Sequence, residues 1–265
     1  MTVSVRPLSP VLGAEVTGID LNGGIDAATF SVLHHAFLEH LVLVFPGQHL
    51  RAGPQEAFSR WWGQPSVLPY LAAHAVDGHP AVLRVENVGK AATVTEHWHF
   101  DSAYFERPPT VSILAAQSLP AVGGDTMWAN QYVAYDALSD GMKGLLDPLL
   151  ACFAGSVADA DGVRQEVLTP HPLARTHPET GRRALAVCRP GTSMPCIEGL
   201  TKAESLPLLG FLYDHASRPD FVYRHQWSPG DVVMWDNRCT IHYAVHDYDD
   251  AERTLHRVTI EGSGD

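Results

Sequence analysis

The sequence predicts a mainly β protein with helical additions, built on a β-sandwich or jelly-roll core. Short stretches rich in apolar and β-branched residues end at Pro, Gly or Asp along most of the chain. These stretches do not alternate regularly with helices, as a parallel α/β fold would require. The sequence also has no G-x-G-x-x-G or P-loop motif, which argues against a nucleotide-binding fold.

The first segments of the chain combine strands and helices. GAEVTGIDL (13–21) alternates apolar and polar residues and predicts an opening strand. Residues 27–40 place apolar side chains at helical spacing, and so do residues 131–150. LVLVFPGQ (41–48) predicts a buried strand that stops at Pro-Gly, and a further helix is expected over 55–62.

The remaining segments are mostly extended. Strands are predicted over 110–119, 183–188, 231–236 and 253–262. One helix is expected over 201–217, where Pro207 marks either a kink or a late start. The chain shows no repeat and no long polar linker, so residues 1–265 are interpreted as a single domain.

Composition limits the partners that this chain can have. Eighteen Lys and Arg residues against 30 Asp and Glu residues give a formal charge of −12, which disfavours nucleic acid and anionic membranes as partners. No run approaches 18 apolar residues, and the first ten residues lack the apolar stretch of a signal peptide. The four cysteines form no C-x-x-C pair, so we expect a reduced, cytoplasmic protein.

The segment EHWHFDSAYF (96–105) contains the residues that carry chemistry. His99 and Asp101 have the spacing of the first two ligands in a two-histidine, one-carboxylate face for Fe(II). On an extended strand, residues at i and i+2 point to the same side. An H-x-D pair is nevertheless expected about once by chance in a chain with 15 histidines, so an ordinary polar pair is the alternative.

The segment from 235 to 262 adds a histidine and two arginines. His242 follows a predicted strand and loop, and Arg253 and Arg257 lie four residues apart on the last predicted strand. Residues at that spacing share one face of a strand. If that face lines a barrel, the arginines need anionic partners, because an unpaired buried charge is very unfavourable. The alternative is a pair of solvent-facing arginines.

Several long motifs, in order, resemble one known family. They are GAEVTGIDL, LVLVFPGQHL, HWHFDSAYFERPP, LPAVGGDTMWANQYVAYDALS, HPLARTHPETGRRAL and WDNRCTIHYAVHDYDDAERTLHRVTI. Together they extend over nearly the whole chain. The sequence thus resembles the taurine dioxygenase (TauD/TfdA-like) family of Fe(II)/2-oxoglutarate-dependent oxygenases.

The resemblance implies a fold and a reaction. The fold is a double-stranded β-helix (a jelly-roll, cupin-like core) with the metal at one mouth of the barrel. The co-substrates are 2-oxoglutarate and O2, the products are succinate and CO2, and a C–H bond of a small anionic or amino-acid-like substrate is hydroxylated. Relatives often form homo-oligomers, so a dimer or a tetramer is an open expectation.

The resemblance also implies the roles of individual residues. His99, Asp101 and His242 would bind Fe(II), and Thr126 and Arg253 the distal carboxylate of 2-oxoglutarate. Arg257 lies with this co-substrate set and would also bind an anionic group of the substrate. Because the carboxylate ligand Asp101 is present, hydroxylation is favoured over halogenation. Trp235 and the DNR turn at 236–238 are expected to support His242.

The substrate itself is less well defined by the sequence. Thr95 stands where taurine-acting members carry Asn, which weakens a specific assignment to taurine. Ordinary packing or surface exposure is the alternative role for every residue of the candidate substrate pocket. These residues are Tyr70, His74, Thr95, His97, Ser102, Tyr104, Arg189 and Arg257.

Three alternatives stay open at this point. Desaturation, cyclisation or C–N oxidation would begin with the same hydrogen abstraction as hydroxylation. His97, His99 and Asp101 also fit part of the H-x-H-x-D-H motif of zinc hydrolases, although Ser102 replaces its last histidine. A jelly roll that binds a ligand without catalysis is the third alternative.

Overall fold

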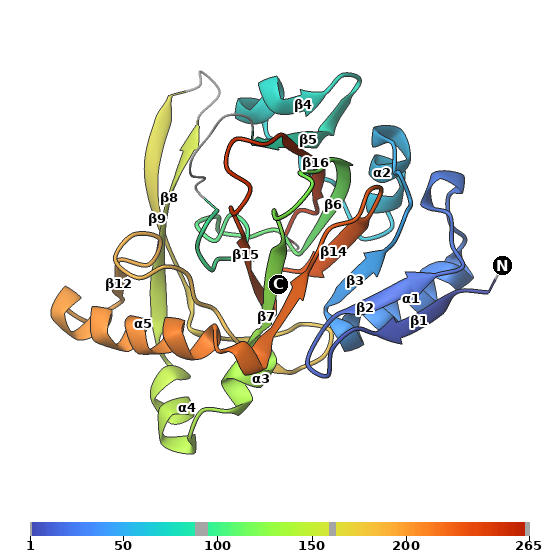
Figure 1. Ribbon diagram of the computed structural model, residues 1–265. Coiled ribbons are helices and arrows are strands. Elements are labelled where there is room, and N and C mark those ends of the chain that lie inside the picture. The colour runs from blue at the N-terminus through green and yellow to red at the C-terminus, as the bar shows by residue number, and fades with distance from the viewer. Residues whose placement is uncertain (1, 88–94, 159–162, 263–265) are drawn as a thin grey trace.

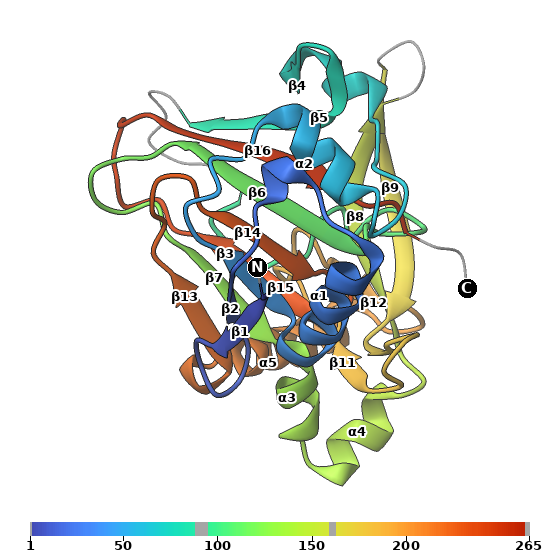
Figure 2. The ribbon, with the colours of Figure 1, turned by 90° about the vertical axis from the view of Figure 1, so that its right-hand side faces the viewer.

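A computed structural model describes residues 2–87, 95–158 and 163–262. Within these ranges the largest sheet has eight strands in the order β1-β2-β3-β14-β6-β16-β5-β4 (Figures 1 and 2). Neighbouring strands are antiparallel except β2 and β3. The strands are β1 (Ser4–Pro7), β2 (Ala14–Thr17), β3 (Val42–Phe45), β4 (Ala75–Val76), β5 (His79–Asn87), β6 (Val111–Ser118), β14 (Val232–Asp236) and β16 (Arg253–Thr259).

A smaller sheet faces the large one and completes the jelly roll. Its order is β13 (Val222–His225), β7 (Thr126–Asn130) and β15 (Thr240–Ala244). Alternate residues of both sheets point inward, as strand geometry requires. On β14, for example, Val233 and Trp235 belong to the core that contains Trp128 of β7, whereas Val232 and Met234 point to the opposite face.

Two helices cover the outer face of the large sheet. Figure 2 shows α1 (Ala27–His40) and α2 (Ala52–Ser59) in front of it. Phe37 and Phe58 from these helices pack against Ile113 and Val258 of the sheet. The Asp26 side chain accepts a hydrogen bond from Thr29 N–H (2.8 Å) and so caps the start of α1.

A third group of elements packs beside the smaller sheet. The helix α5 (Lys202–Ala216) begins with a capping box formed by Thr201 and Glu204, and it contains Pro207. The helix thus starts before the proline. The other elements are α3 (Gln131–Asp136), α4 (Asp140–Leu146), β8 (Leu150–Ala158), β9 (Arg164–Pro172), β10 (Ala174–Thr176), β11 (Arg183–Leu185) and β12 (Cys196–Ile197); short 3-10 helices are η1 (Leu21–Gly23), η2 (Pro69–His74) and η3 (Pro219–Phe221).

One predicted helix is wrong. Residues 131–150 form two short helices, α3 and α4, and Leu150 already begins β8. A side-chain cap between them starts the second helix: Ser139 Oγ accepts from Met142 N–H at the start of α4. The helical spacing of apolar residues continues across the break and so concealed it.

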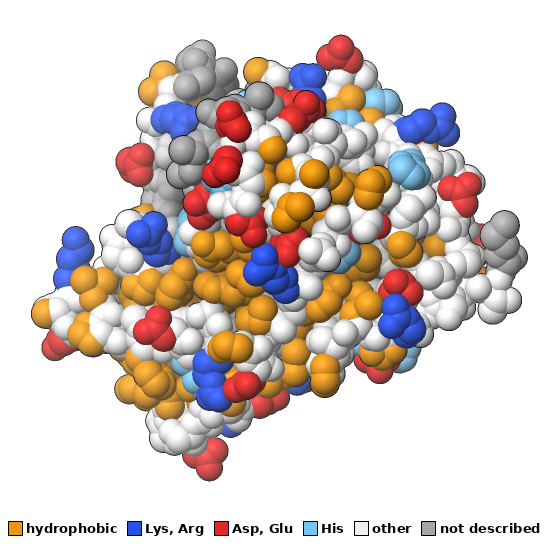
Figure 3. Space-filling model, in the orientation of Figure 1, with side chains coloured by type: hydrophobic (Ala, Val, Ile, Leu, Met, Phe, Trp, Pro, Cys, Tyr) orange, Lys and Arg blue, Asp and Glu red, His pale blue; other side chains and the backbone are white. Residues whose placement is uncertain are grey.

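The predicted mainly β, jelly-roll class is confirmed, and the strands over 13–21, 41–48, 110–119, 183–188, 231–236 and 253–262 each contain an observed strand. The long β8–β9 hairpin was not predicted; it pairs nine residues of each strand. No helix in the described ranges is long and apolar enough to cross a membrane. Figure 3 shows hydrophobic side chains on the face near α5, where Phe211 is exposed.

Candidate active site

Three potential metal ligands converge on the inner side of the smaller sheet. His99 and His242 form an isolated antiparallel bridge, in which His99 N–H donates to His242 O (3.1 Å) and His242 N–H donates to His99 O (2.7 Å). Asp101 follows in a turn. One ligand atom from each of the three residues lies within 4.8 Å of the others. The two side chains reach the same point, as expected from their spacing, although Asp101 lies in a turn rather than on an extended strand.

The hydrogen bonds of this cluster leave ligand atoms available. His99 Nδ1 bonds to the carbonyl oxygen of His97 (2.8 Å), so Nδ1 carries the proton and the Nε2 lone pair is free. His242 Nδ1 is buried and has no hydrogen-bond partner within the described ranges. The other ring nitrogen, Nε2, lies 3.9 Å from Asp101 Oδ1 and is the ligand atom that faces the carboxylate.

Burial and charge set the protonation states that a metal ion requires. Burial lowers the pKa of His242 to about 3, and the neighbouring His99 acts in the same direction. Burial also lowers the pKa of His99, although Asp101 opposes this effect. For Asp101 burial alone would raise the pKa, but Arg257 and both histidines lower it to about 2. At neutral pH the cluster thus holds two neutral imidazoles and one carboxylate.

The β-sheet register brings a potential carboxylate-binding pair next to this cluster. Thr126 of β7 lies opposite Ala244 of β15, two residues from His242. Arg253 of β16 faces Thr126 across the barrel, with Nη2 3.5 Å from Thr126 Oγ1, while its Nε donates to Gly124 O (3.0 Å).

Arg253 is a buried cation without a counter-ion. It is 5% exposed, and no carboxylate among the described residues lies within ion-pairing distance of it. Burial lowers the pKa of Arg253, although Tyr248 and Asp125 oppose this effect. An anion bound here would compensate the buried charge.

One cavity of about 310 Å³ joins the metal-ligand cluster to Arg253. Thr95 and Arg257 also line it, and Arg257 Nη1 donates to Asp101 Oδ1 (3.3 Å). A second hollow of about 410 Å³ adjoins this cavity, and both share Arg257. The Arg257 side chain therefore lies between the metal-ligand cluster and the outer hollow.

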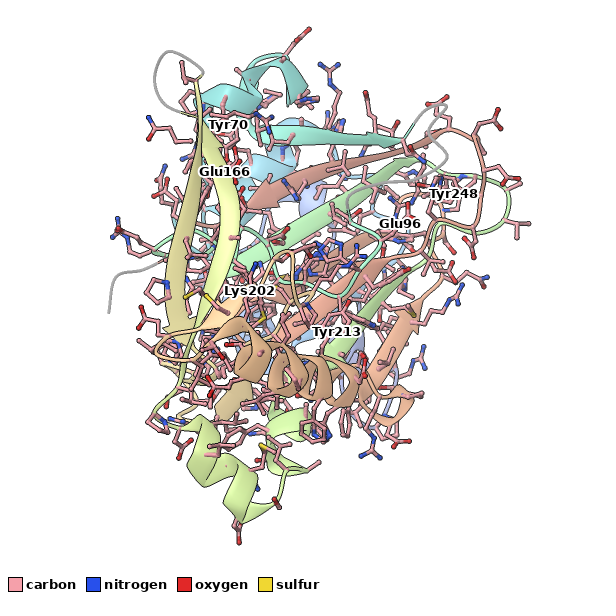
Figure 4. All side chains as sticks on the ribbon, turned by 90° about the vertical axis from the view of Figure 1, so that its left-hand side faces the viewer. Tyr70, Glu96, Glu166, Lys202, Tyr213 and Tyr248 are labelled. Atoms are coloured by element: carbon pink, nitrogen blue, oxygen red, sulfur yellow. The ribbon has the colours of Figure 1, made fainter. Side chains whose placement is uncertain are left out.

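The other candidate substrate residues surround these spaces to different degrees. His74 lines the outer hollow. Tyr70 lies against Tyr104, and burial together with this neighbour raises its pKa to about 12. Figure 4 shows Tyr70 and Glu166 near the upper end of the β8–β9 hairpin. The Tyr104 ring in turn lies on the backbone of Gly155 in β8, where a Cβ would overlap the ring.

Three further candidates, like Tyr70 and Tyr104, are not among the residues that line either hollow. The His97 ring packs beside that of His99, with centroids 5.0 Å apart, and burial is the main cause that lowers its pKa to about 4. Ser102 has a left-handed backbone (φ 45°) and begins the turn that Phe105 N–H closes. Arg189 is exposed in a turn closed by Met194 N–H.

Two sets of residues at the cavity were missed from the sequence. Trp227 Nε1 donates to Thr126 Oγ1 (3.0 Å). At the Arg253 end, His246 Nδ1 bonds to Glu96 Oε1 (2.9 Å) and Asn87 Nδ2 lies 2.9 Å from His246 Nε2. Figure 4 shows Glu96 and Tyr248 on the same side of the molecule. These contacts join segments far apart in the chain, so no local motif signals them.

The DNR turn at 236–238 was expected to support His242, but the structure shows it next to a different candidate ligand. Trp235 contacts His242, with ring centroids 4.9 Å apart. Asn237 instead reaches Asp101, because its Oδ1 lies 3.4 Å from Asp101 N and its Nδ2 donates to Ser112 Oγ, which bonds to the Asp101 carboxylate. The turn therefore supports the carboxylate rather than the second histidine.

A second group of potential ligands, His177, Asp236 and Cys239, is saturated by hydrogen bonds. Its ligand atoms also lie within 4.8 Å of one another. Asp236 Oδ2 bonds to His177 Nε2 (3.0 Å) and to Arg238 Nη2 (2.6 Å), and its Oδ1 accepts from Arg238 N–H and Nε. His177 Nδ1 accepts from the backbone N–H groups of residues 179 and 180. No ligand atom of Asp236 or His177 remains free.

Comparison with known proteins agrees with this site. The model of the family "Taurine catabolism dioxygenase TauD, TfdA family" matches residues 4–259. An alpha-ketoglutarate-dependent sulfate ester dioxygenase of Pseudomonas putida is 35% identical (99% of this chain, 90% of the relative). An alpha-ketoglutarate-dependent 2,4-dichlorophenoxyacetate dioxygenase of Cupriavidus pinatubonensis is 34% identical (98% of each chain). The crystal structure of a taurine dioxygenase from Burkholderia xenovorans superposes with a TM-score of 0.87 at 36% identity (98% of this chain, 90% of that chain).

Fold, site and comparisons together define a jelly-roll dioxygenase that depends on 2-oxoglutarate (α-ketoglutarate) and oxidises a small molecule. The chain belongs to the TauD, TfdA family. The expected family and reaction class are confirmed, and the zinc-hydrolase and binding-module alternatives do not agree with them.

Proposed function

We propose that His99, Asp101 and His242 hold Fe(II) and that the enzyme hydroxylates a C–H bond of a small organic anion. The observation that carries this proposal is the convergence of one ligand atom from each of the three residues within 4.8 Å, with His99 Nε2 free and His242 Nε2 3.9 Å from Asp101 Oδ1. Two imidazoles and one carboxylate suit a divalent first-row metal and leave coordination positions open. The bound metal would supply the redox chemistry with O2.

Arg253 and Thr126 would bind the distal carboxylate of 2-oxoglutarate. Arg253 can donate two parallel hydrogen bonds to a carboxylate, a geometry that a lysine cannot offer. Trp227 Nε1 and Arg253 Nη2 both approach Thr126 Oγ1, so the hydroxyl proton of Thr126 is free to point into the cavity. In the overall reaction, 2-oxoglutarate, O2 and R–H give succinate, CO2 and R–OH.

Arg257 would attract the anionic group of the primary substrate. It is the cation shared by the inner cavity and the outer hollow; His74 lines the outer hollow, and Tyr70 is close enough to interact electrostatically with Arg257. The two relatives named above act on a sulfate ester and on a phenoxyacetate, which are both organic anions. Desaturation, cyclisation and C–N oxidation are the alternative outcomes of the same hydrogen abstraction.

An anaerobic titration tests the metal and co-substrate part of this proposal. Adding Fe(II) and then 2-oxoglutarate is expected to produce the weak visible charge-transfer band of the chelate, and His99→Ala should lose it. The band should shift when a bound substrate approaches the metal, so alkyl sulfates, phenoxyalkanoates, sulfonates and amino acids can be screened with it. A protein that binds Fe(II) tightly but gives no band with 2-oxoglutarate would overturn the assignment.

The single domain over residues 1–265, the dimer or tetramer and the cytoplasmic location stay predictions. Light scattering during size-exclusion chromatography would measure the oligomeric state directly.

A further inference from the structure

Asp101 is held by a directional chain of buried hydrogen bonds on the side away from the histidines. Ser112 Oγ donates to Asp101 Oδ2 (2.6 Å), and Asn237 Nδ2 donates to Ser112 Oγ (2.8 Å). Ser112 is completely buried and Asn237 is 1% exposed. A carboxylate can only accept, so the single proton of Ser112 must point to Asp101. The order of donation along this chain is therefore fixed from Asn237 to Ser112 to Asp101.

The Asn237 amide cannot reverse this order by flipping. Its Oδ1 accepts from Trp235 Nε1 (2.9 Å), and an indole N–H is only a donor. Its backbone is fixed as well, because Asn237 N–H donates to Thr110 O (2.9 Å) and Arg175 Nη2 donates to Asn237 O (3.1 Å). Asn237 is thus held by the neighbouring backbone and side chains on several sides.

Strand register places Ser112 beneath the carboxylate. Ser112 of β6 lies opposite Trp235 of β14, and its inward direction follows from the alternation along β6, where Leu114 also points into the barrel. The serine hydroxyl is therefore positioned by the large sheet, whereas Asp101 lies in a turn. The strand β6 thus positions the hydroxyl that bonds to Asp101, and the Asp101 N–H donates to Asn237 Oδ1 (3.4 Å).

We infer that Ser112 and Asn237 are positioning residues that give the two carboxylate oxygens of Asp101 different roles. This inference rests on the proposed function of Asp101 as a metal ligand. Oδ2 stays bonded to Ser112. Oδ1 accepts from Arg257 Nη1 (3.3 Å) and lies 3.9 Å from His242 Nε2, so its remaining lone pair is the one offered to the metal. If Asp101 binds the metal through one carboxylate oxygen rather than two, more coordination positions stay open for the co-substrate and O2.

The test measures Mn(II) affinity, without turnover, by the electron paramagnetic resonance signal of the free ion. Outer-shell partners of metal ligands typically contribute tenfold to a hundredfold in affinity. Ser112→Ala and Asn237→Ala should each weaken Mn(II) binding by about that factor, and Ser112→Thr, which keeps the hydroxyl, should restore it to within about threefold. The double variant should be little weaker than either single variant, because both residues act through one chain.

Ser205→Ala is the matched control. Ser205 is also completely buried and its Oγ accepts from Ile197 N–H (3.0 Å), but it lies on α5 and has no contact with Asp101. This variant should lose thermal stability without any change in Mn(II) affinity. If Ser112→Ala does not fold, Asn237→Ala and Ser112→Thr still test the inference.

The outcomes separate this inference from the proposed function. Wild-type Mn(II) affinity in a folded Ser112→Ala or Asn237→Ala protein would overturn the positioning role, and so would an equal loss of affinity in Ser205→Ala. Failure of the wild type to bind Mn(II), or unchanged binding in Asp101→Ala, would instead overturn the metal site itself.

Discussion

Two buried groups in this molecule contain similar residues but differ in how their polar atoms are satisfied. His99, Asp101 and His242 form one group, and His177, Asp236 and Cys239 form the other; in both, the ligand atoms lie within 4.8 Å of one another. In the second group Arg238 makes three hydrogen bonds to Asp236, and His177 uses both of its ring nitrogens. In the first group His242 Nδ1 has no partner within the described ranges.

The comparison shows that residue type and proximity do not by themselves define a metal site. A saturated group stabilises the fold, because each buried polar atom already has its partner. A group with free ligand atoms inside a cavity is less favourable on its own and becomes satisfied when a ligand binds. The group of His99, Asp101 and His242 lines the cavity that leads to Arg253. The group that contains Asp236 does not line this cavity and is paired with Arg238.

The largest expected effect is the loss of activity in Asp101→Ala. Without the carboxylate the metal loses one of three ligands, so succinate formation should fall by about a thousandfold or more, equivalent to about 4 kcal/mol in the barrier. Circular dichroism should show a folded protein. Succinate formation measured with saturating Fe(II) and 2-oxoglutarate tests this prediction. Near-wild-type turnover in Asp101→Ala would show that the group of His99, Asp101 and His242 does not bind the metal ion.

A loss of stability is expected when the saturated group is broken. Asp236→Ala leaves Arg238 and His177 without their buried partner, which should lower the free energy of unfolding by about 3–5 kcal/mol. His242→Ala, the matched change in the open group, should lower it by less than about 1 kcal/mol in the metal-free protein. Urea unfolding of both variants compares them directly; the reverse order of destabilisation would contradict the comparison.

The Arg253 end of the cavity tests the same comparison, because no carboxylate of the described residues lies within ion-pairing distance of this buried cation. Arg253→Gln should raise the KM for 2-oxoglutarate by an amount equivalent to about 2–5 kcal/mol. Arg253→Lys should recover only part of this loss, since lysine cannot make two parallel hydrogen bonds. Steady-state kinetics at varied 2-oxoglutarate test this, with Arg183→Gln, at an exposed ion pair with Asp147, as control. An unchanged KM in Arg253→Gln would exclude the assigned role.

The smallest expected effect is a dependence of stability on pH. Arg238 and His177 outweigh burial and hold the pKa of Asp236 well below its usual value. Its stabilising effect is therefore complete above the unfolded pKa of about 3.9 and is lost as the pH falls toward the folded value. The stability difference between wild type and Asp236→Asn should stay constant from about pH 7 to pH 5 and shrink below about pH 4. Urea unfolding at each pH measures this stability difference. If the difference instead grew as the pH fell, the pKa of Asp236 would be raised rather than lowered in the folded protein.

The sequence predicted the helices over 27–40 and 201–217 and six of the strands, but it did not predict the three strands of the smaller sheet. Strands such as 231–236 are short, apolar and bounded by Gly and Asp, so the local pattern is sufficient. The predicted helix over 131–150 is broken where Ser139 caps the start of α4, and a continuous helical spacing of apolar residues concealed this break. The β8–β9 hairpin was missed because β9 contains many polar residues and so lacks the apolar pattern of a strand.

The candidate metal ligands were named from motifs, but the residues that contact them were not. His99, Asp101 and His242 belong to two segments whose resemblance to a family is visible in the sequence, and the structure brings them together. Ser112 could not be assigned in this way, because its contact with Asp101 depends on the register of β6 against β14. Trp227 is a similar case, since it reaches Thr126 only across the barrel.

The central claim is that only the group with free ligand atoms binds a metal ion, and Co(II) titration tests it most directly. Co(II) is visible to absorption spectroscopy, and bonding to a cysteine thiolate adds a characteristic charge-transfer band. We predict one Co(II) per chain, without a thiolate band, and loss of binding in His242→Ala but not in Cys239→Ser. A second equivalent with a thiolate band, or binding that survives in His242→Ala and disappears in Cys239→Ser, would contradict the account.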